Sequence, residues 1–215
     1  PLDLNKLGTV GVIGPNANSI PCLEGNYNGT SSRYVTFLEG IRKACEGRAR
    51  VLYSQGSHLY VDRISNLATA DDRLAEAVGV AERCDVNVLC LGLDATLEGE
   101  EGDTSNEYSS GDKRDLNLPA CQRKLLDAVL ATGKPTVVVL ASGSALAVTQ
   151  GNAILEAWYP GEAGGTALAR ILFGEVSPSG RLPVTFYHGV DELPDFEDYA
   201  MENRTYRYFA GEPLY

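Results

Sequence analysis

Short runs in which almost every residue is apolar or β-branched constrain the fold of this chain more than any other feature. The clearest run is Thr136-Val-Val-Val-Leu-Ala141, and similar runs lie at residues 9–14 and 86–91. A strand that is apolar at nearly every position is buried on both faces, as in a parallel sheet covered by helices on each side. The sequence therefore predicts buried parallel strands.

Segments between these runs have helical periodicity. Residues 34–45, for example, repeat apolar side chains at the spacing of one helix face. The predicted helices lie at residues 34–45, 71–84, 119–132 and 166–173, and the further predicted strands lie at residues 50–53, 153–158 and 184–187. This alternation predicts an α/β fold: a three-layer α/β/α sandwich with a mostly parallel, doubly wound sheet.

The last part of the chain differs from the rest. Residues 191–215 carry a group of acidic side chains followed by a group of aromatic ones, without a clear period. A docking tail and an irregular surface segment both fit this composition. We therefore predict one α/β domain over residues 1–190 and an irregular tail over residues 191–215.

Charge and cysteine usage exclude several classes of partner. A net charge of -11 argues against nucleic acid and against an anionic membrane surface. No apolar run approaches the roughly 20 residues that span a bilayer as a helix. The five cysteines are scattered, without the paired spacing of a zinc or redox site, and an odd number fits a reducing compartment. We expect a cytoplasmic location on this ground.

An acidic loop follows the predicted strand at 86–91. Residues 92–103 contain glycines at three positions and five acidic side chains, which are Asp94, Glu98, Glu100, Glu101 and Asp103. In an open α/β sheet, ligands bind at the carboxyl ends of the strands. A carboxyl that becomes buried among other carboxyls holds its proton more tightly, as a general acid near neutral pH must. An ordinary acidic surface loop in water is the alternative.

Other chemistries find little support. The turn after the first strand contains Pro15 and lacks the pattern G-x-G-x-x-G, and the chain has no P-loop sequence. Ser142-Gly143-Ser144 lacks the flanking glycine of a serine nucleophile, and His58 and His188 belong to no recognisable arrangement. The acidic loop also lacks the spacing of a calcium site. We therefore expect no cofactor and no metal, and paired-carboxylate chemistry remains.

Several stretches of the sequence carry a resemblance to a known family. They lie at residues 2–6 and 10–18, 91–103, 115–119 with Gln122, 157–165, 177–186 and 204–209. Together they resemble the C-terminal α/β-sandwich domain of glycoside hydrolase family 3. The matches span nearly the whole chain.

The resemblance implies two catalytic carboxyls on two domains. The nucleophilic Asp of such enzymes lies on an N-terminal (β/α)8 barrel, which is outside this chain, and the general acid/base is a Glu on the acidic loop. The family pattern E-x-E-x-x-D places Glu100 in that role, with Glu98 as the runner-up. Glu101 and Asp103 are expected to contact the substrate, although Asp103, like Asp94, could instead orient the loop through backbone N–H groups.

The function that this resemblance implies is that of a retaining β-glycosidase of the β-xylosidase or β-glucosidase type. Its substrates would be terminal non-reducing sugars of plant-derived oligosaccharides, and its partner would be the barrel domain. The tail is then expected to dock on a neighbouring domain, and a secreted parent enzyme becomes the alternative to a cytoplasmic one. A non-catalytic carbohydrate-binding or interaction module with the same fold is the competing hypothesis.

Overall fold

One parallel sheet forms the centre of the molecule. The computed structural model describes residues 1–64, 67–100 and 112–215. Within them, five strands are ordered β2-β1-β3-β4-β5, and every neighbouring pair is parallel. The strands are β1 (Thr9–Ile13), β2 (Arg50–Ser54), β3 (Val86–Gly92), β4 (Thr136–Ala141) and β5 (Ala153–Glu156). The predicted α/β class and parallel sheet are confirmed.

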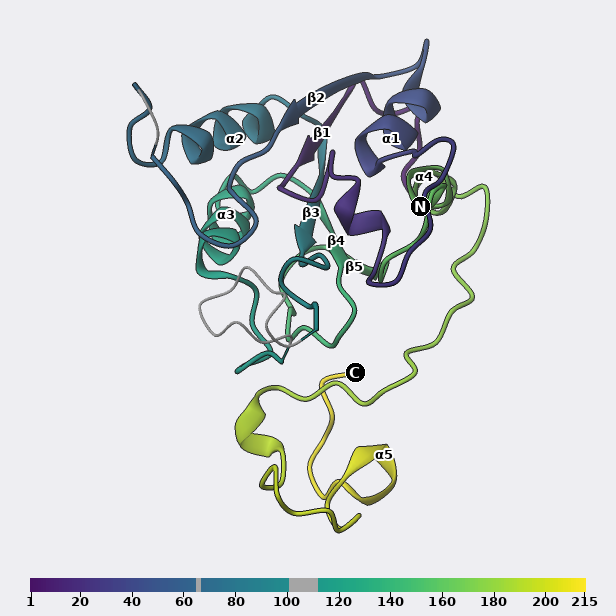
Figure 1. Ribbon diagram of the computed structural model, residues 1–215. Coiled ribbons are helices and arrows are strands. Elements are labelled where there is room, and N and C mark those ends of the chain that lie inside the picture. Colours follow the sequence, from purple (N-terminus) through teal and green to yellow (C-terminus); the bar gives the residue numbers. More distant parts are fainter. Residues whose placement is uncertain (65–66, 101–111) are drawn as a thin grey trace.

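Helices cover both faces of this sheet (Figure 1). α1 and α4 pack together on one face, while α2 and α3 pack together on the other. The helices are α1 (Phe37–Cys45), α2 (Asp72–Glu82), α3 (Ala120–Leu130), α4 (Gly164–Leu172) and α5 (Thr205–Tyr208), with short 3-10 turns η1 (Pro21–Leu23) and η2 (Val190–Glu192). Among the described residues, no helix combines the length and the apolar character needed to cross a membrane.

The central strands are buried along their full length, as their sequences predict. All residues of β3 and β4 are buried. Because successive side chains of a strand point to opposite faces, β3 contributes to two apolar cores. Val88 and Cys90 join the core under α1 and α4, whereas Leu89 and Leu91 join the core under α2 and α3.

The structure departs from the prediction at several places, and the start of α1, the end of β5 and residues 184–187 each have a clear physical reason. α1 begins at Phe37 instead of residue 34, because the Thr36 hydroxyl caps it by accepting the Glu39 N–H at 3.2 Å. β5 ends at Glu156 instead of residue 158, since Trp158 adopts a left-handed φ of 53°. The strand predicted at 184–187 is wrong: there, Phe186 exchanges backbone hydrogen bonds with residues 214 and 215 without forming a strand.

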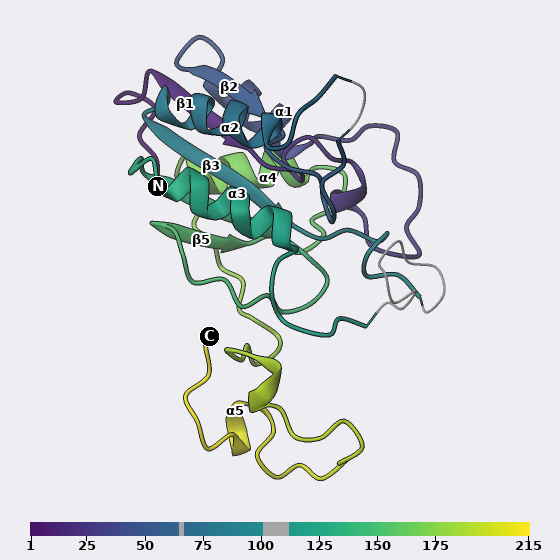
Figure 2. The same ribbon diagram turned by 90° about the vertical axis from the view of Figure 1, so that its left-hand side faces the viewer.

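The C-terminal segment leaves the sandwich after α4 and lies beyond one edge of it (Figures 1 and 2). It contains η2 and α5 and exposes large aromatic side chains. Phe196, Tyr199 and Tyr206 are among the most exposed of these. Docking of residues 191–215 on a neighbouring domain stays a prediction.

Candidate active site

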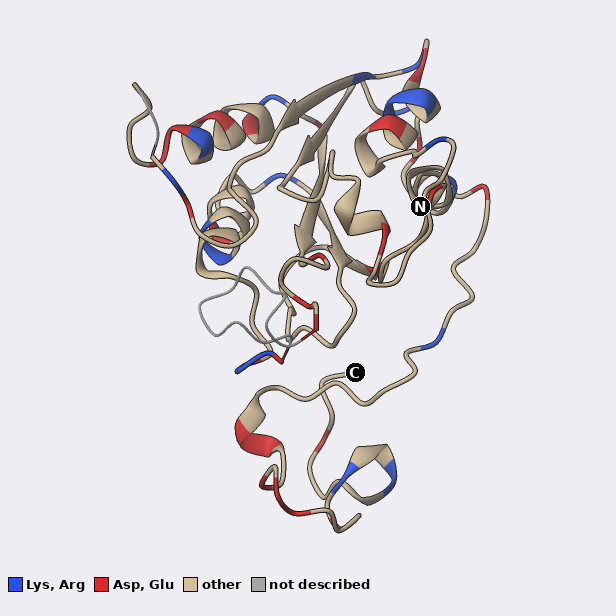
Figure 3. Cartoon of the chain, viewed as in Figure 1, with Lys and Arg blue, Asp and Glu red and all other residues tan. Residues whose placement is uncertain are grey.

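The acidic loop begins at the carboxyl end of β3, at the edge of the sheet where the loops after β1, β4 and β5 also begin (Figure 2). Gly92 starts it with a φ of 134°, and a Cβ at this position would lie 1.9 Å from the Ala141 carbonyl oxygen. Only glycine fits such a turn. Figure 3 shows the acidic residues of the described part of this loop at that edge.

Two buried amides hold the start of the loop. Gln122 of α3 accepts the Gly92 N–H at 2.8 Å on Oε1, and its Nε2 donates to the Gly92 carbonyl at 2.7 Å. Asn16, from the loop after β1, donates its Nδ2 to the Leu93 carbonyl at 2.9 Å. Gln122 and Asn16 are both completely buried. The path of the chain out of β3 is therefore fixed from two sides.

Asp94 shapes the next turn and does not face solvent. Its Oδ1 accepts the Thr96 N–H at 2.9 Å and the Thr96 hydroxyl at 2.6 Å, and its carbonyl accepts the Glu98 N–H at 3.0 Å. The side chain is 6% exposed. This is the orienting role that the sequence left open for Asp94.

Glu98 is half-buried, and both of its carboxylate oxygens are engaged. Oε2 accepts the Gly143 N–H at 2.7 Å and the Tyr159 hydroxyl, while Oε1 accepts the Ser144 hydroxyl. Gly143 and Ser144 follow β4, and Tyr159 follows β5. In the sequence, residues 142–144 lack the pattern of a serine nucleophile, and nothing in the local pattern marks Tyr159 as a functional residue.

Glu100 is exposed at the tip of the described part of the loop. Its Oε1 accepts a hydrogen bond from the Tyr27 hydroxyl at 2.8 Å. The neighbouring Asn26 donates its Nδ2 to the Glu98 carbonyl at 3.2 Å, so the segment after η1 lies against the acidic loop. Glu101 and Asp103, the predicted substrate contacts, lie outside the described residues.

A second carboxyl lies behind the loop, at the end of β5. Burial raises the pKa of Glu156 to about 7, and the charge of Glu98 adds to that rise, while the Trp158 N–H, the Ser142 hydroxyl and Lys113 oppose it. Its Oε1 lies 3.2 Å from the Trp158 nitrogen, and its Oε2 is buried with no hydrogen-bond partner among the described residues. Glu156 was not among the predicted site residues, although a lone Glu in an otherwise apolar run is a signal that the sequence contains.

Lys113 is the cation of this group. Its Nζ donates to the Ala145 carbonyl at 2.6 Å. Burial lowers the pKa of Lys113, while Glu98, Asp115 and Glu156 oppose that change by their negative charge. The carboxyl edge of the sheet thus holds a partly buried group of mixed charge, formed by Glu98, Glu156 and Lys113.

In the part of the chain that the structure describes, no three His, Cys, Asp or Glu side chains are placed to hold a metal ion.

Replacing Glu156 by glutamine is expected to flatten the pH dependence of stability. The folded-state pKa of about 7 lies above the ordinary 4.5, so the folded chain binds the extra proton between these values. Stability then falls as pH rises through this window, by up to about 3 kcal/mol.

Urea unfolding at pH 5 and pH 8 measures the change. Glu156→Gln should lose much less stability than the wild type over this range, with Glu46→Gln, an exposed carboxyl, as control. Parallel pH curves for the wild type and Glu156→Gln would contradict this assignment.

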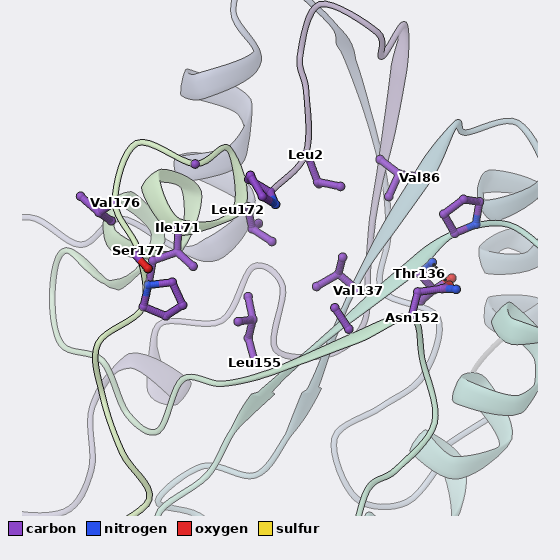
Figure 4. A pocket seen from close by; sticks show the side chains of 15 residues that line it. Leu2, Val86, Thr136, Val137, Asn152, Leu155, Ile171, Leu172, Val176 and Ser177 are labelled. Carbon is purple, nitrogen blue, oxygen red and sulfur yellow. Dashed lines mark hydrogen bonds between the residues drawn. The ribbon is translucent and has the colours of Figure 1, made fainter.

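A mostly apolar cavity lies elsewhere in the described chain. It has a volume of about 460 Å³ and lies between α4 and the amino ends of β3 and β4, at the opposite edge from the acidic loop (Figure 4). Leu2, Val137, Leu155 and Leu172 are among the side chains that line it. A site for a polar ligand such as a sugar needs precisely placed polar groups that fix the orientation of the ligand. This lining offers few, so the acidic loop remains the candidate site.

Comparison with known proteins decides the family. A model of the glycosyl hydrolase family 3 C-terminal domain matches residues 1–215, the whole chain. The chain belongs to glycoside hydrolase family 3. As a family 3 C-terminal domain, it is similar to a xylan 1,4-beta-xylosidase of Xylanibacter ruminicola, with 48% identity over 127 residues, which cover 57% of this chain and 15% of that protein. It is also similar to the periplasmic beta-glucosidase of Salmonella typhimurium, with 34% identity over 245 residues, 100% of this chain and 31% of that protein.

Solved structures of a beta-glucosidase and of a family 3 exo-beta-xylosidase share the fold of this domain. A beta-glucosidase from Erythrobacter marinus superposes with a TM-score of 0.79 at 34% identity, covering 100% of this chain and 31% of that one. A family 3 exo-beta-xylosidase, solved with a xylobiose aziridine probe, superposes with a TM-score of 0.73 at 25% identity, covering 98% of this chain and 27% of that one. The matched part of this chain therefore covers between 15% and 31% of the length of these relatives.

Proposed function

We propose that this domain supplies the general acid/base of a retaining β-glycosidase and that Glu100 is the residue that carries the proton. The observation that supports this proposal is the contrast between two neighbouring carboxylates. Glu98 gives both oxygens to groups of its own domain, whereas Glu100 is exposed at the carboxyl edge of the sheet and receives the Tyr27 hydroxyl on one oxygen.

In the proposed reaction, Glu100 protonates the glycosidic oxygen as the leaving group departs. The same carboxylate then removes a proton from the water that releases the glycosyl-enzyme intermediate. Tyr27, by donating to Oε1 at 2.8 Å, would limit the rotamers of a long side chain in the open site. Glu101 and Asp103 would contact the substrate.

A second carboxyl must act as nucleophile about 5–5.5 Å from the acid/base in a retaining enzyme. We place it on another domain of the same protein, an N-terminal barrel against which the acidic loop would close. The relatives are long enough for such a domain, since this chain covers 31% of the Salmonella beta-glucosidase. The exposed aromatic side chains of residues 191–215 would dock on a neighbouring domain.

The substrates we propose are terminal, non-reducing xylose or glucose units of plant-derived oligosaccharides. The names of the relatives, beta-xylosidase and beta-glucosidase, support this choice between sugars without ranking the two. We also propose a cytoplasmic location. Five free cysteines are compatible with it.

The isolated 215-residue chain is expected to show no turnover of an aryl β-xyloside or an aryl β-glucoside, because its nucleophile is missing. The full-length enzyme should hydrolyse at least one of them with retention of configuration, measured by NMR of the first-formed product. Circular dichroism of the isolated chain checks in the same experiment whether it is folded. Turnover by that folded chain would refute the two-domain proposal.

The isolated chain and the full-length enzyme also distinguish the proposed acid/base role from the competing hypothesis of a non-catalytic module. Calorimetry measures binding of xylobiose and cellobiose to the isolated chain. Tight binding, combined with full activity of a full-length Glu98→Ala, Glu100→Ala and Glu101→Ala triple variant, would establish a binding module. We expect the triple variant to be inactive toward both oligosaccharides.

A further inference from the structure

We propose that Glu98 is a positioning residue, whose carboxylate locks the acidic loop onto the loops after β4 and β5 and thereby sets the place of Glu100. The inference rests on the proposed role of Glu100, but it makes a separate claim about Glu98. It assigns to Gly143, Ser144 and Tyr159 the function of a socket for that carboxylate.

The hydrogen bonds of Glu98 cross long distances in the sequence. Gly143 and Ser144 lie 45 and 46 residues away, and Tyr159 lies 61 residues away. An ionised carboxylate is an acceptor-only group with room for several donors, which matches a socket made of one N–H and two hydroxyls. One side chain therefore joins the loops after three neighbouring strands.

The socket also argues against Glu98 as the proton carrier. A general acid must bring its proton within hydrogen-bond reach of the leaving oxygen. Both oxygens of Glu98 already bind donors of this domain, at 2.7 Å for the Gly143 N–H. A proton on either oxygen would compete with one of these donors for the carboxylate and would weaken the attachment of the loop. A donated proton would also have to leave this set of hydrogen bonds to reach a substrate.

The backbone near Tyr159 is arranged to serve this contact. Trp158 adopts a left-handed φ of 53°, a strained conformation for a residue other than glycine. Its N–H is held by Glu156 Oε1 at 3.2 Å, and its ring packs edge-on against Phe186 at 6.2 Å. This strained turn directs the next residue, Tyr159, toward Glu98.

The chemistry of Tyr159 keeps it a donor. Burial, followed by the negative charge of Glu98, raises the pKa of Tyr159 well above its ordinary value. The phenol therefore stays protonated over the range in which a glycosidase works. Because a displacement of about 1 Å at a catalytic group can cost on the order of 100-fold in rate, a firm anchor two residues from Glu100 matters.

Kinetics of the full-length enzyme test the proposal. Glu98→Gln replaces one acceptor oxygen by an NH2 group, which cannot accept a hydrogen bond from the donors of the socket. Tyr159→Phe removes one of these donors. We expect Glu98→Gln to lower kcat for a substrate with a poor leaving group by about 10–100-fold with KM little changed, and Tyr159→Phe to lower it less. Azide should not restore the rate of either variant. Glu162→Gln, at an exposed carboxyl near the socket, is the control.

Hydrogen exchange of the 215-residue chain gives a readout that needs no activity. Amides of residues 96–99 and of Gly143 should exchange faster in Glu98→Gln and in Tyr159→Phe, and should be unchanged in Glu162→Gln. Unchanged exchange in both socket variants would overturn the proposal, and Tyr159→Phe decides the matter if Glu98→Gln does not fold. Formation of a glycosyl azide by Glu98→Ala would also overturn it, because Glu98 would then be the proton carrier. If exchange is faster in the socket variants but Glu100→Ala keeps wild-type activity, the socket proposal stands and the proposed function of Glu100 is refuted.

Discussion

Replacing Glu100 by alanine in the full-length enzyme is expected to lower kcat/KM by about 10²–10⁴-fold for substrates with poor leaving groups. These substrates need a proton on the departing oxygen. Aryl glycosides with strongly acidic phenols need no such help, so their first step should be nearly unaffected. The rate should therefore become steeply dependent on the pKa of the leaving phenol, where the wild-type enzyme shows a shallow dependence.

Azide provides the second half of this experiment. With the carboxylate removed, the second step lacks its base, and azide can attack the glycosyl-enzyme intermediate without one. Glu100→Ala should recover turnover of an activated substrate in azide and release a glycosyl azide with retained configuration. If Glu98→Ala shows this behaviour and Glu100→Ala does not, the assignment moves by two residues along the loop.

Replacing Gly165 by alanine is expected to destabilise the isolated chain by at least about 3 kcal/mol. α1 and α4 meet through their backbones at this point. A Cβ on Gly165 would lie 1.9 Å from the Thr36 carbonyl oxygen, and one on Gly40 would lie 2.0 Å from the Gly165 carbonyl oxygen. Overpacking costs about 1–3 kcal/mol where side chains can shift, and here the obstacle is backbone that caps α1.

Urea unfolding followed by circular dichroism measures this loss, and two other glycines provide controls. A Cβ on Gly79, inside α2, would meet only the flexible tip of Arg83 at 3.2 Å. Gly79→Ala should therefore stabilise the chain by about 0.5–1 kcal/mol. Gly180→Ala, in open space, should change little. A Gly165→Ala variant as stable as the wild type would show that the two helices lie farther apart in solution.

The position of α4 also concerns the site. The loop that carries Trp158 and Tyr159 leads directly into α4, and its Gly161 N–H donates to the Leu23 carbonyl at 2.7 Å. A displaced α4 would therefore move the socket of Glu98. Milder substitutions at the α1–α4 contact should lower catalytic rate before they unfold the domain.

Elements with a strong local pattern were predicted correctly, whereas the strand predicted at 184–187, which has no partner strand among the described residues, was not. The run at 136–141 became β4, buried at every position, because a strand between two helical layers must be apolar on both faces. The strand predicted at 184–187 did not form. β-propensity needs a partner strand. Among the described residues, the backbone of Phe186 is hydrogen-bonded to Leu214 and Tyr215 and not to a strand.

The sequence alone was sufficient to predict the parallel α/β sandwich, the family and the position of the acidic loop at the carboxyl ends of the strands. These properties follow from residue patterns a few positions apart. The different situations of Glu98 and Glu100, and the raised pKa of Glu156, appeared only in the folded chain. Hydrogen bonds and burial depend on which side chains meet in space, and the donors to Glu98 come from loops at least 45 residues away.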